Sequence, residues 1–140
     1  IQKMMPDTIL LSAQFELVTT TTCHLCNLTL SREIFLYQRI SQKCSLFCST
    51  PSCLLNLHDI YGAKALRNDD TGDTAAYFQI FACPTEKKRR KFIRICFRVA
   101  EFDDVLLNLD LARLWVRAFS WLLKDPAVDS TKIRGIFKAF

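Results

Sequence analysis

The stretch FIRICFRVAEFDDVLLNLDLARLWVRAFSWLLK, residues 92–124, decides the fold because the spacing of its apolar residues changes partway along. Over 92–100, apolar and polar side chains alternate, as in a strand with one buried face. Four side chains of this strand are expected to face the interior: Ile93, Ile95, Phe97 and Val99. From 103 to 124 the apolar residues recur every three or four positions, as in an amphipathic helix. The sequence therefore predicts a strand followed directly by a long helix.

The charges at both ends of the predicted helix are favourable for its dipole. Asp103 and Asp104 lie at the positive N-terminal end, and Lys124 lies at the negative C-terminal end. Pro126 stops it soon afterwards. Its predicted apolar stripe consists of Leu107, Leu111, Leu114, Trp115, Ala118, Phe119 and Leu122. We expect four of these residues to plug the end of a strand assembly: Leu111, Trp115, Ala118 and Leu122. Arg113 and Arg117 lie one turn apart on a flank.

Short strand-like runs occupy the chain before residue 92. They cover 9–18, 23–30, 33–40, 53–66 and 75–83, with turns or loops at 41–52 and 67–73. Within 53–66, Gly62 is expected to mark a bulge or a sharp bend. The fold class is therefore mainly β with one C-terminal helix, in a bent antiparallel barrel or sandwich that the helix caps. We expect one domain over 8–125 and a tail or linker over 126–140.

Composition restricts the classes of protein. The chain has 140 residues, of which half are hydrophobic and 24% are charged, so a disordered chain is excluded. No apolar run reaches the roughly 20 residues of a membrane span. The sequence has no secretory pattern, and the missing initiator Met suggests a fragment. The seven cysteines are expected to be free thiols in a reducing cytosol.

The order of strands followed by one helix resembles the pleckstrin-homology layout, in which the helix carries an inward tryptophan; Trp115 lies where that residue would be expected. A more specific resemblance lies in residues 55–100, which look like the non-catalytic N-terminal region of sphingosine kinases. DTAAYFQIFACP, residues 73–84, is the closest piece. LLSAQFELV, SREIFLYQRI and RLWVRAFSWLLKD fall in matching order on either side, so the resemblance covers about residues 10 to 125.

The resemblance implies a regulatory and membrane-positioning module of a lipid kinase. The parent enzyme would transfer the γ-phosphate of ATP to a sphingoid base with magnesium. This chain has three unclustered glycines, so it lacks the glycine-rich loops that bind ATP phosphates. ATP and magnesium are therefore expected to belong to a kinase domain outside this chain. For this chain itself we expect no cofactor and no catalytic residue. Tyr77 and Phe81 are expected to dock that kinase domain or a protein partner.

A run of five cations precedes the strand at 92–100, and its charge equals the whole net charge of +5. We expect it, with Arg94, to contact anionic lipid headgroups; the residues are Lys87, Lys88, Arg89, Arg90, Lys91 and Arg94. Each contributes about 1 kcal/mol at best near such a surface, so the contact would be weak and salt-sensitive. Pleckstrin-homology domains that capture phosphoinositides stereospecifically have Lys and Arg around the first hairpin loop. The matching loop here, VTTTTCHLC (18–26), has neither, so the resemblance does not extend to such capture. The expected location is cytoplasmic and peripheral to a membrane.

Four alternatives stay open. In the first, the cations only form a solvated turn between two strands; in the second, they are a nuclear-import signal that an import receptor binds. Nucleic acid is a less favoured partner, bound on a strand face with Tyr77, Phe81, Arg94 and Arg98, because the glycine-containing aromatic motif of RNA-binding sheets is missing. Zinc is also less favoured. Its candidate ligands are Cys23, Cys26, Cys44 and Cys48, and the two histidines of the chain, His24 and His58, are also available as ligands.

Overall fold

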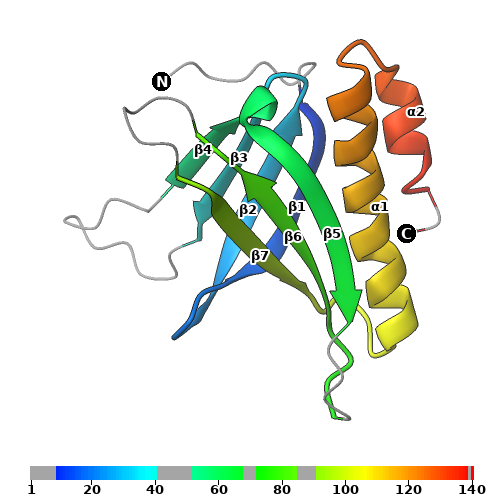
Figure 1. The fold of residues 1–140 in the computed structure, drawn as a ribbon. Helices are drawn as coiled ribbons and strands as arrows, with labels where there is room; N and C mark the ends of the chain where they lie inside the picture. The colour runs from blue at the N-terminus through cyan, green and yellow to red at the C-terminus, as the bar shows by residue number, and fades with distance from the viewer. Residues whose placement is uncertain (1–8, 41–51, 68–71, 85–90, 139) are drawn as a thin grey trace.

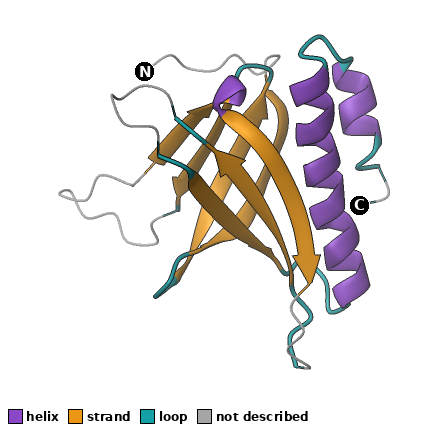
Figure 2. Ribbon diagram, viewed as in Figure 1, coloured by secondary structure: helices purple, strands orange, loops and turns teal. Residues whose placement is uncertain are grey.

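A bent antiparallel sheet capped by helices forms the molecule, in a computed structural model that describes residues 9–40, 52–67, 72–84, 91–138 and 140. The strands are β1 (Ile9–Val18), β2 (Cys23–Ser31), β3 (Ile34–Arg39), β4 (Ser52–Asn56), β5 (Ile60–Arg67), β6 (Ala76–Ala82) and β7 (Ile93–Val99). A 3-10 turn, η2 (Leu57–Asp59), and the helices α1 (Val105–Lys124) and α2 (Ser130–Gly135) complete it. The strand order is β4-β3-β2-β1-β7-β6-β5, and Figures 1 and 2 show both helices on one side of the sheet. The mainly β fold class with a capping helix is confirmed.

β7 joins the two halves of the sheet because it pairs with β1 on one side and with β6 on the other. Its alternation is the predicted one: Ile95, Phe97 and Val99 are buried, whereas Arg94 is exposed. The Phe97 ring lies at the centre of an aromatic core. Its ring centroid lies 5.3 Å from that of Phe78 and 5.9 Å from that of Phe35.

α1 closes the sheet through Trp115, which is buried. The indole stacks on Phe78 with 6.0 Å between centroids and an 11° interplanar angle, and it meets Phe15 edge-on at 5.7 Å. Leu111, Ala118 and Leu122 are buried beside it, so all four residues predicted to plug the sheet lie in the core. Offset and edge-to-face aromatic pairs of this kind add to the apolar area that they remove from water.

The start of α1 is fixed by two polar side chains. Asp104 caps the helix and accepts from the Leu106 backbone N–H at 2.8 Å. Asn108 is fully buried; its Nδ2 donates to the carbonyls of Thr74 (2.7 Å) and Phe102 (2.8 Å), and its Oδ1 accepts from the Phe102 N–H (3.0 Å). Asn108 thus ties the helix to the loop before it and to the entry of β6. A buried amide is stable here because all of these bonds are made.

The apolar stripe of α1 is rotated from the predicted one. Leu107 is 42% exposed and Leu114 is half-buried, whereas Asn108, Leu109 and Ala112 are buried. The physical reason is that Asn108 must face the sheet to make its hydrogen bonds, and residues one position away on a helix point about 100° apart. Leu107 and Leu114 consequently turn towards the C-terminal segment.

The single strand predicted over 53–66 was wrong, because the chain leaves one edge of the sheet after β4 and enters the other edge at β5. η2 makes this crossing. It is held by two long-range backbone bonds, from the Leu57 N–H to the Glu33 carbonyl and from the Cys83 N–H to the Asp59 carbonyl, both 2.8 Å. The irregularity expected at Gly62 is present as a bulge: Ile60 pairs with Ala82 and Gly62 with Phe81, which leaves Tyr61 as the extra residue.

The segment expected to be a tail or linker, 126–140, packs on the domain where it is described. α2 buries Ile133, and the Phe137 ring lies 6.0 Å from that of Trp115. Arg134 donates to the carbonyls of Leu10 (3.1 Å) and Ile9 (2.6 Å) at the start of β1. The structure therefore adds a short second helix to the single helix that the sequence predicted. None of the helices in the described part of the chain is long and apolar enough to cross a bilayer.

Trp115→Ala tests the closure of the sheet. Removing a fully buried indole leaves a cavity between Phe15 and Phe78, so we expect a loss of roughly 3–5 kcal/mol in the free energy of unfolding. Urea unfolding followed by circular dichroism measures it, with Leu106→Ala on the exposed face of α1 as the control, expected within about 0.5 kcal/mol of the parent. A loss below about 1 kcal/mol for Trp115→Ala would contradict this packing.

Candidate functional site

Three aromatic side chains gather where β5 begins, β6 ends and β7 begins. Tyr61 is 59% exposed and Phe92 is 69% exposed, the highest values among the large apolar side chains that the structure describes. The Tyr61 ring meets Phe92 edge-on at 5.8 Å between centroids and lies 6.2 Å from the half-buried Phe81. We call Tyr61, Phe81 and Phe92 the aromatic cluster. Soluble domains seldom leave contiguous aromatic rings in water without a use for them.

Local backbone structure produces the aromatic cluster. The bulge at the start of β5 inserts Tyr61 as an unpaired extra residue, and bulges characteristically redirect a side chain. Phe81 pairs with Gly62 on one side and with Arg94 on the other. Phe92 precedes β7 and continues the outward parity of that strand, on which Arg94 also lies.

Two cations adjoin the aromatic cluster. Lys91 directly precedes Phe92 and is exposed, and the exposed Arg94 is the cross-strand partner of Phe81. We call Tyr61, Phe81, Lys91, Phe92 and Arg94 together the aromatic–basic surface. The other predicted cations, Lys87, Lys88, Arg89 and Arg90, lie outside the described residues. The described part of this surface therefore offers positive charge and apolar contact.

Tyr77 does not belong to this surface. It lies four residues before Phe81 on β6, about 13 Å away along the strand, and it is half-buried. Its hydroxyl donates to Asp73 Oδ2 at 3.1 Å, and Asp73 Oδ1 pairs with Arg98 Nη2 at 3.1 Å. The docking pair predicted from the sequence is thus divided between a structural network, which holds Tyr77, and the aromatic cluster, which holds Phe81.

Arg98 takes part in the same network. In addition to Asp73 it pairs with Glu16 of β1 at 3.5 Å. The nucleic-acid hypothesis used Tyr77, Phe81, Arg94 and Arg98 on one face. Arg98 forms ion pairs with two carboxylates, and Tyr77 is hydrogen-bonded to Asp73. Two of the four residues of that hypothesis therefore make contacts within the domain.

The pKa of Asp73 is lowered, first by the Ala75 backbone N–H, which donates to its Oδ1 at 3.0 Å. Desolvation opposes this effect, and the Tyr77 hydroxyl and Arg98 add to it. A lowered carboxyl pKa means that the charged form stabilises the fold, and that this contribution disappears as the pH falls through the folded-state pKa.

Zinc ligation receives no support in the described part of the chain. Cys23 and Cys26 are three residues apart on β2 and face opposite sides of the strand; Cys23 is exposed and Cys26 lies in the core. Cys44 and Cys48 lie outside the described residues. His24 contacts the Thr22 hydroxyl at 2.8 Å and His58 lies 3.4 Å from Asp59, and the described residues hold no group of three potential metal ligands.

Comparison with solved structures finds similar chains, whereas the two comparisons by sequence find none. Neither a protein-family model nor a curated protein matches the chain. Among solved structures, the chain is similar to the crystal structure of the DH/PH domains of p115-RhoGEF, with 12% identity and a TM-score of 0.48, over 87% of this chain and 31% of that chain. This chain therefore spans about a third of its neighbour's length. The succession of seven antiparallel strands followed by a helix agrees with the mainly β, helix-capped layout predicted from the sequence.

Asp73→Asn tests the network that holds Tyr77. Because the folded pKa lies below the ordinary value of 3.8, the carboxylate stabilises the fold above about pH 4. We expect the variant to unfold at lower urea concentration than the parent at neutral pH, and the gap to narrow as the pH falls below about 4. Equal stability at neutral pH, or a gap that persists undiminished in acid, would contradict the assignment.

Proposed function

We propose that this chain is a non-catalytic module that positions its parent protein at an anionic membrane surface, and that the aromatic–basic surface makes the contact. One observation carries the proposal: the two most exposed large apolar side chains described, Tyr61 and Phe92, lie together and are flanked by Lys91 and Arg94. Aromatic rings favour the headgroup region of a bilayer, and cations favour anionic headgroups.

The energies favour reversible contact. Each cation contributes about 1 kcal/mol near an anionic surface, and burying an exposed phenylalanine contributes roughly 1.5–3 kcal/mol at most. The charge contribution weakens with salt, because the Debye length falls from ~10 Å at 0.1 M to ~3 Å at 1 M, whereas the apolar contribution does not. Binding through both should therefore be only partly salt-sensitive.

The remaining cations extend the same proposal. Lys87, Lys88, Arg89 and Arg90 directly precede Lys91 in the sequence, so they would add to the charge beside Phe92. The same run fits recognition by an import receptor, which would place the protein in the nucleus as well as in the cytoplasm. We propose a cytoplasmic protein that associates peripherally with membranes.

The parent protein is proposed to be a sphingosine-kinase-like lipid kinase. This rests on the resemblance of residues 55–100, above all of DTAAYFQIFACP at 73–84. ATP and magnesium would then act in a kinase domain outside this chain. That domain, or another protein, is the second candidate occupant of the aromatic cluster, because exposed aromatic rings are also typical centres of protein interfaces. Vesicle binding distinguishes the two occupants.

Vesicle flotation of the whole chain tests the membrane proposal. We expect binding to phosphatidylserine-containing vesicles that exceeds binding to phosphatidylcholine vesicles and declines at high salt. Phe92→Ser should weaken binding about tenfold at either salt concentration, and the double variant Lys91→Ser, Arg94→Ser by about tenfold to thirtyfold at low salt. Leu54→Ser is the matched control, since Leu54 is 54% exposed but lies on β4, and it should bind like the parent.

Two results would count against this assignment. Identical vesicle binding by Phe92→Ser and Leu54→Ser would show that Phe92 does not touch the bilayer. Absence of flotation with both kinds of vesicle would overturn the membrane proposal and favour the protein-docking alternative.

A further inference from the structure

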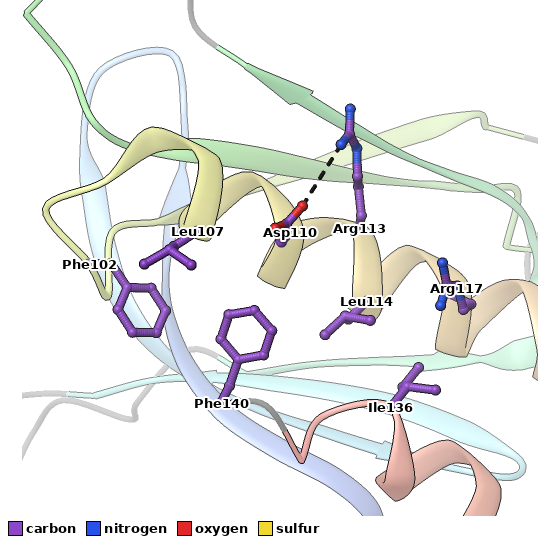
Figure 3. A pocket seen from close by; sticks show the side chains of 8 residues that line it. All are labelled: Phe102, Leu107, Asp110, Arg113, Leu114, Arg117, Ile136 and Phe140. Carbon is purple, nitrogen blue, oxygen red and sulfur yellow. Dashed lines mark ion pairs between the residues drawn. The ribbon is translucent and has the colours of Figure 1, made fainter.

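A groove runs between α1 and the segment that follows α2 (Figure 3), away from the first residues of β7 (Figure 1). Its volume is about 580 Å³. Apolar side chains from both walls line it: Phe102, Leu107 and Leu114 on one side, Ile136 and Phe140 on the other. Asp110, Arg113 and Arg117 form its polar rim.

The α1 wall has the spacing of a helix-packing seam. Leu107, Asp110, Leu114 and Arg117 follow one another at steps of three, four and three residues, the pattern by which one helix presents a continuous line of side chains to another. The rotation of α1 that buries Asn108 turns this line outward. The line spans ten residues, about 15 Å at 1.5 Å per residue, or nearly three helical turns.

The groove is too open for a small molecule. Pockets for small ligands enclose most of the ligand surface, whereas this groove leaves Leu107 42% exposed and Phe140 46% exposed. An amphipathic helix would cover Leu107 and Phe140 with its apolar face, which removes both side chains from water, and would leave its polar face in solvent. Helices that dock in grooves use apolar anchors at i, i+3 or i+4, and i+7, a spacing that matches the seam.

The charges at the rim favour an acidic occupant. Arg113 lies 3.9 Å from Asp110, and both side chains are more than half exposed, so this pair holds the arginine weakly. Within the described residues, Arg117 has no carboxylate within 4.0 Å. Two arginines and one aspartate therefore line the groove, which leaves an excess of positive charge at its rim.

We infer that this groove binds an acidic amphipathic helix of a protein partner, with its apolar residues on Leu107 and Leu114 and its carboxylates beside Arg113 and Arg117. This surface lies apart from the aromatic–basic surface and does not depend on it. The domain would thus be able to hold a membrane and a protein at the same time.

Selection from a displayed library of short helical peptides, against the whole chain in solution, tests the inference. We expect the selected peptides to combine an apolar i, i+3 or i+4, i+7 stripe with acidic flanks. Their affinity, measured by fluorescence anisotropy, should fall about tenfold or more for Leu107→Asp and for Arg117→Glu. Leu107 and Arg117 are not buried, so both variants should fold, which circular dichroism checks. Leu54→Asp and Phe92→Ser are the controls and should bind the peptides like the parent.

Three outcomes would overturn the inference. The first is a selection that gives no specific peptide. The second is a set of selected peptides that are basic or lack helical spacing. The third is peptide binding that survives both Leu107→Asp and Arg117→Glu. In addition, loss of binding to phosphatidylserine-containing vesicles in these two variants, with no effect on peptides, would assign the groove to a membrane instead.

Discussion

The contact of Trp115 with Phe15 and Phe78 is the interaction on which the rest of this structure depends. β1 and β6 belong to different halves of the sheet, and the indole packs between a ring from each. This packing sets the rotation of α1 about its axis. Asn108 fixes the same rotation, because its side chain can make its three hydrogen bonds in only one orientation. That rotation buries Leu111, Ala118 and Leu122 and leaves Leu107 and Leu114 on the side of α2. The groove is a consequence of how the core is closed.

Much of this arrangement was predictable from local pattern. The alternation over 92–100 gave the inward and outward faces of β7, and the helical spacing with Asp104 and Lys124 located α1 almost to the residue. The alternation along β7 also indicates that Phe92 is exposed, since Phe92 and Arg94 lie two residues apart and share the outward face. Local pattern did not reveal the division of 53–66 into β4 and β5. Its crossing at η2 contains no glycine or proline and is held by bonds to Glu33 and Cys83, which only the fold brings close.

The candidate site was predictable in part for the same reason. Arg94, Lys91 and Phe81 were identified from their sequence pattern, but Tyr61 reaches Phe81 only through a bulge in a strand whose start was misplaced. Tyr77 looked equivalent to Phe81 because both have the same parity on β6. The difference between them arises from Asp73, which follows the turn between β5 and β6 and captures the Tyr77 hydroxyl. Partners of that kind are set by tertiary placement, so alternation alone assigns a face but not a role.

In the function that we propose, the aromatic–basic surface contacts a membrane and the groove binds a protein partner. The aromatic–basic surface combines modest charge and apolar contributions, which suits reversible attachment, and the groove is built from other elements. The most direct test of the central claim is a nuclear magnetic resonance measurement of the unmodified chain with phosphatidylserine-containing bicelles that carry a spin-labelled lipid. The account predicts that the ring resonances of Phe92 and Tyr61 broaden most strongly, while those of Phe102 and Trp121 stay sharp. Strongest broadening at Phe102 or Trp121, or none at Phe92, would contradict it.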